Sequence, residues 1–452
     1  MSLTDRIQAA ERAQAESSSA PIVYVKSDVL EELKANAVQS LYSRIGARIN
    51  DSNLSEEQLR GFVRTELAAI LEESSVNLTA EERRGLTAEI EADALGLGPI
   101  QRLLDDDSVT EIMVNHPNQI YVERGGSLTL SDQVFSSEDQ LRRVIERIVS
   151  KVGRRIDESS PLVDARLADG SRVNAVIPPL AVRGSSLTIR KFAKKAFQVE
   201  DLIKFGSMTP ELAELLELCV RGRLNVLVSG GTGTGKTTLL NVLSSFIPEG
   251  ERIVTIEDAI ELKLQQPHVV QLESRPPNVE GRGEVNIRDL VKNSLRMRPD
   301  RVVIGECRGG EALDMLQAMN TGHDGSISTL HANSPRDCVA RLETLVLMAG
   351  MDLPLRAIRE QIGSAVDLIV QIYRMRDGSR RITHVTELTG VENGEAVLHD
   401  LYRFDFAAGY STEGKPLGQV EAVGSGEHLT SILEERGVSV PKHLLANRKE
   451  SA

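Results

Sequence analysis

The sequence lacks the features by which many nucleic-acid-binding proteins hold their ligand. It has no tryptophan among 452 residues, and aromatic side chains make up only 3%. Aromatic rings are the platforms on which single-stranded bases stack, so recognition by stacking is disfavoured. Basic residues are also outnumbered, with 53 Lys and Arg against 66 Asp and Glu and a net charge of −13. Such a surface repels nucleic acid and anionic lipid on average, so contact with either would need a local basic patch.

Cysteine and long apolar runs are scarce as well. The three cysteines (Cys219, Cys307 and Cys338) are an odd number without CxxC spacing, which disfavours a disulfide framework or a zinc site. We expect small buried thiols in a reducing compartment. No run approaches the ~18 apolar residues that span a bilayer, and the first residues contain no apolar signal region. The expectation is a cytoplasmic protein without a transmembrane segment, which reaches a membrane only through a protein partner.

The apolar fraction of 40% fills cores, and the length suggests roughly two to four domains. Gly96-Leu97-Gly98-Pro99 punctuates the chain, and apolar residues at helical spacing precede it. The predicted organisation is a flexible arm at 1–25, a helical bundle at 26–95, an α/β domain at 96–200, a hinge at 201–208, a second α/β domain at 209–394 and a C-terminal appendage at 395–452.

The segment 96–200 predicts strands at 111–115, 119–124, 172–179 and 186–192, and a helix at 138–152. Ten basic residues against five acidic ones give residues 151–200 a local charge of +5. This is the one clear basic surface, and several arginines lie on predicted strands.

From about 209 onward, helices alternate with short apolar strands. The predicted strands are 225–229, 252–257, 269–272, 301–306, 326–331, 367–373 and 381–388. Helices between several of them indicate a mainly parallel sheet covered on both faces, which is an α/β fold.

A glycine-rich segment with the pattern GxxxxGK[ST] follows the first of these strands and precedes a helix. Its residues are Gly230, Gly231, Thr232, Gly233, Thr234, Gly235, Lys236 and Thr237, with Thr238 next in line. The glycines let successive N–H groups curl around anionic oxygens, and the helix N-terminus adds positive field. Lys236 is expected to reach the β- and γ-phosphates of ATP, Thr237 to lie on Mg²⁺, and Thr238 to contact the α-phosphate.

Carboxylates end two further strands. Glu306 closes 301–306, where a parallel sheet binds ligands, and it is predicted to support the metal; capping of the following glycine-rich turn is the structural alternative. Glu257, Asp258 and Glu261 cluster at the end of the strand 252–257. A carboxylate there can orient the ligand shell of magnesium, and another can accept a proton from the attacking water. A merely solvated strand end is the alternative here.

Two histidines stand in the segment 321–332. His331 closes a predicted strand, and His323 lies in a glycine-flanked turn. Neither has metal-site spacing, and a structural role is the common one for such a histidine. Because both follow the Glu306 strand, sensing of the γ-phosphate is plausible for at least one of them.

Taken together, the blocks 96–100, 111–126, 153–180, 187–192, the phosphate loop, 255–262, 295–316 and 321–333 resemble the secretion-ATPase superfamily of type II and type IV secretion and pilus motors. Within it, the chain looks like the CpaF-type ATPase of tight-adherence (Flp) pilus assembly. The likeness spans roughly residues 96–390.

This resemblance implies a RecA-like P-loop motor domain preceded by a smaller α/β domain, a homo-hexamer that binds ATP and Mg²⁺, and inner-membrane platform proteins as partners. Glu257 corresponds to the general base of the family, Glu306 to its Walker B glutamate and metal ligand, and His331 to its His-box histidine. Arginines of the N-terminal domain approach the phosphates in this family; by position these are Arg172, and also Arg166, Arg183 or Arg190.

Two other functions remain open at this point. A nucleic-acid motor of RecA or helicase type shares the core fold, although the charge and the lack of aromatics disfavour it. A ring that binds nucleotide without hydrolysing it is the second, and the intact Lys236, Thr237, Glu257 and Glu306 argue against it.

Overall fold

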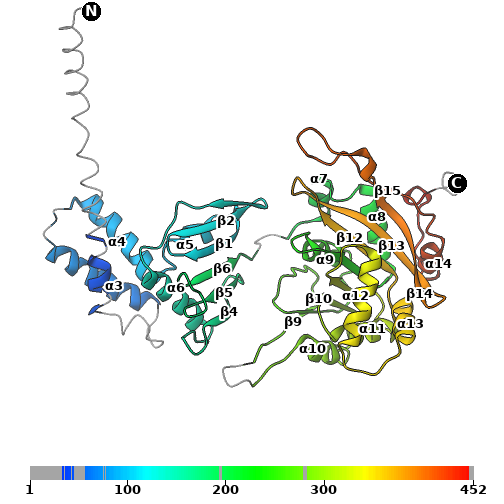
Figure 1. Ribbon diagram of the computed structural model, residues 1–452, viewed down its shortest axis with the longest axis horizontal. Helices are drawn as coiled ribbons and strands as arrows, with labels where there is room; N and C mark the ends of the chain where they lie inside the picture. The colour runs from blue at the N-terminus through cyan, green and yellow to red at the C-terminus, as the bar shows by residue number, and fades with distance from the viewer. Residues whose placement is uncertain are drawn as a thin grey trace, which may run out of the picture. The chain divides into compact units, whose positions relative to one another are not determined.

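The computed structural model describes residues 33–34, 36–41, 43–44, 56–74, 76, 78–192, 196–277 and 282–446. The flexible arm predicted at 1–25 lies outside these residues. The chain divides after Phe192 into two compact units, which we call the N-terminal unit and the C-terminal unit. Figure 1 labels the helices and strands of both units.

The N-terminal unit begins with helices where the bundle was expected. Helix α3 (Glu56–Glu73) and helix α4 (Ala80–Leu95) are joined by an ion pair, in which Arg64 Nε lies 2.8 Å from Glu91 Oε2. The apolar side chains buried between the helical segments are Leu33, Ala37, Leu41, Val63, Leu67, Ile70, Leu71, Leu86 and Ile90. Apolar residues at helical spacing therefore pack into a small core of their own.

A six-stranded sheet follows, with the order β3-β2-β1-β6-β5-β4 and antiparallel pairing throughout. Its elements are α5 (Ile100–Asp105), β1 (Val109–His116), β2 (Gln119–Arg124), β3 (Ser127–Leu130), α6 (Glu138–Lys151), β4 (Leu162–Arg166), β5 (Arg172–Val176) and β6 (Ser186–Arg190). Ser137 caps α6 by accepting the Gln140 N–H, and the apolar stripe of α6 packs on one face of the sheet. The sequence predicted β1, β2, β5, β6 and α6, and missed β3 and β4.

The C-terminal unit is built on a nine-stranded sheet with the order β15-β14-β13-β12-β7-β11-β10-β8-β9. The strands are β7 (Val226–Gly230), β8 (Ile253–Glu257), β9 (Val269–Glu273), β10 (Arg301–Cys307), β11 (Ile327–Leu330), β12 (Leu368–Arg374), β13 (Arg380–Glu392), β14 (Glu395–Phe404) and β15 (Val420–Ala422). Pairing is parallel from β12 through β9 and antiparallel from β12 to β15. All the predicted strands of 209–394 are present, and the expected α/β class is confirmed.

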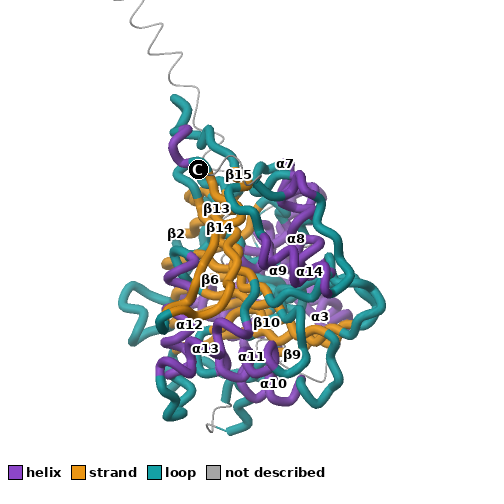
Figure 2. Tube along the Cα trace, turned by 90° about the vertical axis from the view of Figure 1, so that its right-hand side faces the viewer, coloured by secondary structure: helices purple, strands orange, loops and turns teal. Residues whose placement is uncertain are grey.

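Helices cover both faces of this sheet, as Figure 2 shows. One face packs against α7 (Val199–Lys204), α8 (Pro210–Arg221), α9 (Lys236–Ser245) and α14 (Glu427–Glu435). The other packs against α10 (Ile287–Ser294), α11 (Glu311–Asn320), α12 (Pro335–Leu347) and α13 (Leu355–Ala365). Short helical turns occur at Phe406–Ala408 and Lys442–Leu444.

Several helices begin where the sequence carries a start signal. Thr209 and Ser334 are N-caps, each followed by a proline in the first turn, and Asn286 forms a capping box with Asp289. These local signals set the helix positions between the strands.

The structure differs from two expected boundaries. The segment 395–452, expected to be an appendage, supplies β14 and β15 to the same sheet, and Leu429 and Leu433 are buried in its core. The expected hinge 201–208 lies inside the C-terminal unit, where Leu202 and Met208 join that core. A tight turn at Asn393-Gly394, where both residues have positive φ, joins β13 directly to β14, and the sequence interpretation overlooked this hairpin signal. Packing against the core sets the position of 201–208.

The sequence disfavoured a disulfide framework and a transmembrane segment. All three cysteines are free and fully buried, and burial raises the pKa of Cys307 and of Cys338 to about 12. They are core thiols, as predicted. In the described part of the chain, no helix has the length and apolarity to cross a membrane.

Candidate functional site

The glycine-rich loop lies at the carboxyl edge of the parallel strands, between the end of β7 and the start of α9. Gly233 has φ +68° and Gly235 has φ +96°, a region in which a side chain is strained. A Cβ at Gly230 would lie 2.6 Å from the carbonyl oxygen of Ile372, so only glycine fits there. The predicted succession of strand, tight turn and helix N-terminus is therefore present. At each of these three positions the backbone geometry explains why the residue is glycine.

Lys236 lies back over the loop. Its Nζ donates a hydrogen bond to the carbonyl oxygen of Gly231 at 2.9 Å, and the hydroxyl of Thr234 donates to the same oxygen at 2.9 Å. Thr237 and Thr238 are half-buried in the first turn of α9. The N–H groups and positive field at this helix N-terminus suit an anion, and Lys236 adds a full charge beside them.

His331 and Glu306 lie together beside the loop. The imidazole has Nε2 3.4 Å from the hydroxyl of Thr232 and Nδ1 3.8 Å from Glu306 Oε1. The three residues come from the ends of β7, β11 and β10, which are neighbours in the sheet. His323 precedes β11 and so lies at the opposite edge of the sheet from His331. Of the two predicted histidines, only His331 reaches the loop.

Glu257 is buried, with 3% of the residue's surface exposed. Its Oε1 accepts the N–H groups of Glu261 at 2.9 Å and Leu262 at 3.1 Å, which fix the orientation of the carboxylate. On the neighbouring strand β10, a Cβ at Gly305 would lie 3.0 Å from Glu257 Cγ. The glycine thus leaves the space through which the Glu257 side chain passes. Within the acidic cluster, Glu257 points inward while Asp258 is exposed.

Arg308 belongs to this site and was missed by the sequence interpretation. Its Nε and Nη2 donate to Glu306 Oε2 at 3.0 and 2.7 Å, and its Nη1 lies 3.6 Å from Asp258 Oδ2. The hydrogen bonds to Glu306, together with the charges around it, hold the pKa of Arg308 above its usual value. The sequence signal for Arg308 was its position two residues after Glu306, because residues two apart at the end of a strand point to the same face.

The N-terminal unit arranges three of the four candidate arginines in one row. Arg172 is the direct cross-strand partner of Arg166 on one side and of Arg190 on the other. Arg183 lies in the turn between β5 and β6, at the other end of these strands. The register thus separates Arg183 from the row.

The oxygen ligands at the phosphate loop fit a magnesium ion that takes most of its ligands from the phosphates of a nucleotide and from water. Within the described ranges, no group of three or more His, Cys, Asp or Glu side chains could hold a metal. Mg²⁺ in phosphate-binding sites keeps several waters and takes one or two protein ligands, with phosphate oxygens as the others. The hydroxyl of Thr237 and the carboxylate of Glu306 are oxygen ligands of that kind.

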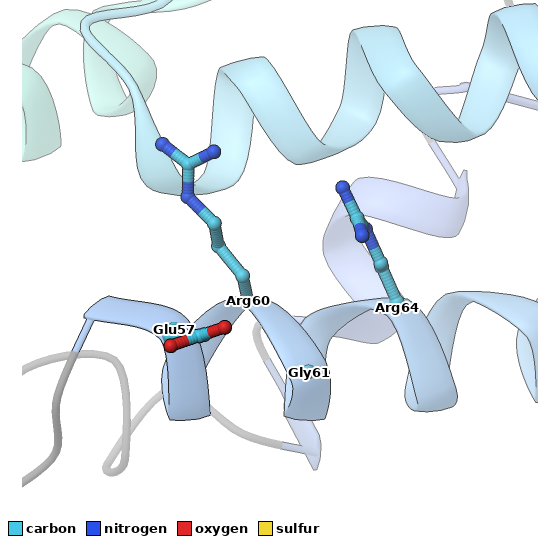
Figure 3. Close-up of a pocket in the computed structure, with 4 residues that line it drawn as sticks. All are labelled: Glu57, Arg60, Gly61 and Arg64. Atoms are coloured by element: carbon cyan, nitrogen blue, oxygen red, sulfur yellow. The ribbon is translucent and has the colours of Figure 1, made fainter.

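A surface hollow in the N-terminal unit contains none of these residues. It has a volume of about 580 Å³ and is lined by Glu57, Arg60, Gly61 and Arg64 on α3. Figure 3 shows Arg60 and Arg64 pointing from α3 toward the neighbouring helix. Since Arg64 is bound to Glu91 there, the hollow is explained by helix packing.

Comparison with known proteins gives a consistent result. The family described as type II/IV secretion system protein matches residues 93–397. The chain is 38% identical over 336 residues to a Mycobacterium tuberculosis protein named "Putative conjugal transfer protein", covering 70% of this chain and 95% of that one. It is 32% identical over 325 residues to the type IV secretion system protein VirB11 of Bartonella henselae, covering 64% and 91%.

Among solved structures, the chain is similar to the VirB11 ATPase from the Brucella suis type IV secretion system, determined in complex with sulphate. The identity is 31%, the match covers 64% of this chain and 95% of that one, and the TM-score is 0.35.

Proposed function

The chain belongs to the family of type II/IV secretion system proteins and is an ATP hydrolase of that family, and from this premise we propose that it is the motor ATPase of a tight-adherence pilus. The phosphate loop with His331 and Glu306 beside it is the observation that best supports an ATP-driven motor. The choice of a tight-adherence pilus rests on the resemblance of the sequence blocks between residues 96 and 390. The motor is proposed to work as a homo-hexamer at inner-membrane platform proteins, from the cytoplasm.

The phosphate loop is proposed to bind the triphosphate of ATP. Loop N–H groups and the α9 N-terminus receive the oxygens, and Lys236 neutralises charge on the β- and γ-phosphates. Magnesium, when bound at Thr237 and Glu306, would neutralise the charge that develops on the β- and γ-oxygens.

Glu257 is proposed to be the general base. A base must be held in a defined orientation toward the proton it accepts, and the N–H groups of Glu261 and Leu262 supply that orientation. The buried position of Glu257 excludes competing bulk water from the carboxylate.

His331 is proposed to report the γ-phosphate. Its imidazole contacts the loop through Thr232 and approaches Glu306 on its other side, so a shift of either neighbour reaches the other. Arg172 and Arg190 of the N-terminal unit are proposed to neutralise charge on the transferred phosphoryl group in the assembled ring. Motion of one unit against the other would then follow nucleotide turnover.

The test is phosphate release by the purified full chain with Mg-ATP, repeated with Lys236→Ala. Removing the loop ammonium should lower kcat at least about a hundredfold. Lys204→Ala, an exposed lysine on α7, is the control and should hydrolyse ATP as the unsubstituted chain does. Hydrolysis by Lys236→Ala at the normal rate would contradict the assignment of the loop.

The two other candidate functions have their own outcomes. Stimulation of hydrolysis by DNA, lost as salt rises, would favour a nucleic-acid motor, whereas we expect no direct nucleic-acid partner. Nucleotide binding without phosphate release would favour a ring that does not hydrolyse ATP.

A further inference from the structure

The β12–β13 hairpin lies beside the phosphate loop, because β12 is the parallel neighbour of β7, the strand that the loop follows. Ile372 of β12 is the register partner of Gly230, where the loop begins, and its carbonyl oxygen would lie 2.6 Å from a Cβ at Gly230. The residues that follow Ile372 in β12 therefore continue along the loop. The tip beyond them is strongly basic, with the sequence Arg374-Met375-Arg376-Asp377-Gly378-Ser379-Arg380-Arg381.

Two of these arginines lie against the loop. The Nη1 atom of Arg374 is 3.8 Å from the place that a Cβ of Gly233 would take, and Cγ of Arg380 is 3.8 Å from that of Gly235. The Nε of Arg380 donates to the carbonyl oxygen of Gly233 at 3.5 Å. Each of the two loop glycines with positive φ, Gly233 and Gly235, thus has an arginine of the hairpin beside it.

The hairpin turn holds the two arginines in place. Asp377 accepts the N–H and the hydroxyl of Ser379 at 3.0 and 2.7 Å, and Gly378 takes the φ of +84° that the turn requires. Burial alone would raise the pKa of Asp377, but the hydrogen bonds from Ser379 and the charge of Arg381 together lower it, which favours the ionised carboxylate in the turn. A rigid turn reduces the entropy lost when the arginines bind a ligand.

The register brings the two charges together. Arg374 and Arg380 are direct cross-strand partners, so their side chains share one face of the hairpin. A phosphate beside this face would be attracted by both positive charges, and a guanidinium group presents paired N–H donors to phosphate oxygens.

The sheet order indicates which phosphates of a bound nucleotide the hairpin would face. Strand β7 lies between β11 and β12, so Glu306 and His331 flank the loop on one side and the hairpin flanks it on the other. The γ-phosphate is expected beside Glu306, where the proposed metal and attacking water lie. The hairpin side is left for the phosphates that remain in the product.

We propose that Arg374 and Arg380 form a second wall of the nucleotide site, within the same chain, and bind the α- and β-phosphates that ADP retains. This inference rests on the proposed function, since it needs ATP at the phosphate loop. It gives the two arginines a role distinct from that of Arg172 and Arg190, which are proposed to act on the γ-phosphoryl group.

The test is titration calorimetry of the full chain with Mg-ADP and with a non-hydrolysable Mg-ATP analogue, for Arg374→Ala and Arg380→Ala. Each substitution should lower the affinity for both nucleotides by a similar factor, about tenfold or more. The reason is that both nucleotides carry the α- and β-phosphates that the removed arginine would bind. Arg374→Lys and Arg380→Lys should recover part of the affinity. Arg376→Ala is the matched control: it removes an arginine of the same hairpin that stacks on Tyr410, 5.5 Å from the ring, and should leave both affinities unchanged.

Unchanged ADP affinity in folded Arg374→Ala and Arg380→Ala would overturn the inference while leaving the proposed function intact. Equal loss in Arg376→Ala would also overturn it, because the effect would then come from the general charge of the hairpin. Absence of any nucleotide uptake by the unsubstituted chain would overturn both proposals. Thermal melting by circular dichroism checks that each variant is folded.

Discussion

The Nδ1 atom of His331 lies 3.8 Å from Oε1 of Glu306, while the other nitrogen of the same ring faces the phosphate loop at Thr232. A single imidazole therefore joins the loop that is proposed to hold the triphosphate to the carboxylate that is proposed to support its metal. This arrangement connects the ends of three neighbouring strands of the sheet, β7, β11 and β10.

Replacing His331 by alanine should lower kcat by about tenfold or more and change ADP affinity little. The substitution removes the connection between the loop and Glu306 but leaves the loop N–H groups and Lys236 in place. Steady-state kinetics and ADP titration measure the two quantities. His323→Ala at the opposite edge of the sheet is the control, and an equal loss of kcat in that variant would refute the role given to His331.

Replacing Gly305 by alanine should lower kcat by about a hundredfold, because the added methyl lies 3.0 Å from Cγ of Glu257 and displaces its carboxylate. Phosphate-release kinetics with saturating Mg-ATP measure the loss. Gly250→Ala is matched to it, since a Cβ there meets nothing within 4 Å. Normal turnover by folded Gly305→Ala would show that hydrolysis does not depend on this placement of Glu257.

Replacing Arg308 by alanine should lower the Mg²⁺ concentration that gives half-maximal hydrolysis, by about fivefold. The guanidinium lies on Glu306 and beside Asp258, so its removal leaves more negative charge for the cation. A magnesium titration of ATP turnover measures the shift. Arg336→Ala, whose side chain is 86% exposed on α12, should show the magnesium dependence of the unsubstituted chain. If Arg308→Ala has the magnesium dependence of the unsubstituted chain, Glu306 does not support the metal.

A buried ion pair at the opposite end of β10 should matter for stability and not for chemistry. Arg301 is fully buried and pairs with Glu251, with Nε 2.5 Å from Oε2, and it also donates to the carbonyl oxygen of Gly325 at 3.2 Å. Removing one partner leaves a buried charge, so Glu251→Gln should lower the free energy of unfolding by about 3 kcal/mol. Urea unfolding measures this change, and the exposed Glu249→Gln is the control. A kcat loss in Glu251→Gln at a temperature where it is folded would argue against a purely structural role.

The sequence by itself determined the local features, because they depend on residues close together in the chain. The phosphate loop from Gly230 to Thr238 is predicted from its own glycines, the strand before it and the helix after it. The strands of the parallel core appear as short apolar runs, and capping residues such as Thr209 and Ser334 mark helix starts. The sequence predicts Glu257, Glu306 and His331 as candidate site residues because each ends a recognisable strand.

Only the tertiary structure decided which of these residues meet. Strand register put Arg166, Arg172 and Arg190 in one row, and it paired Arg374 with Arg380 beside the loop. Successive antiparallel pairing of β13 with β14 and of β14 with β15 adds both strands to the sheet, where composition predicted an appendage. The physical reason is that sheet order arises from pairing between strands far apart in the chain, such as β7 with β11 and β12, which no local pattern of residues encodes. Within a hairpin, the exact register depends on the geometry of the turn that joins the strands.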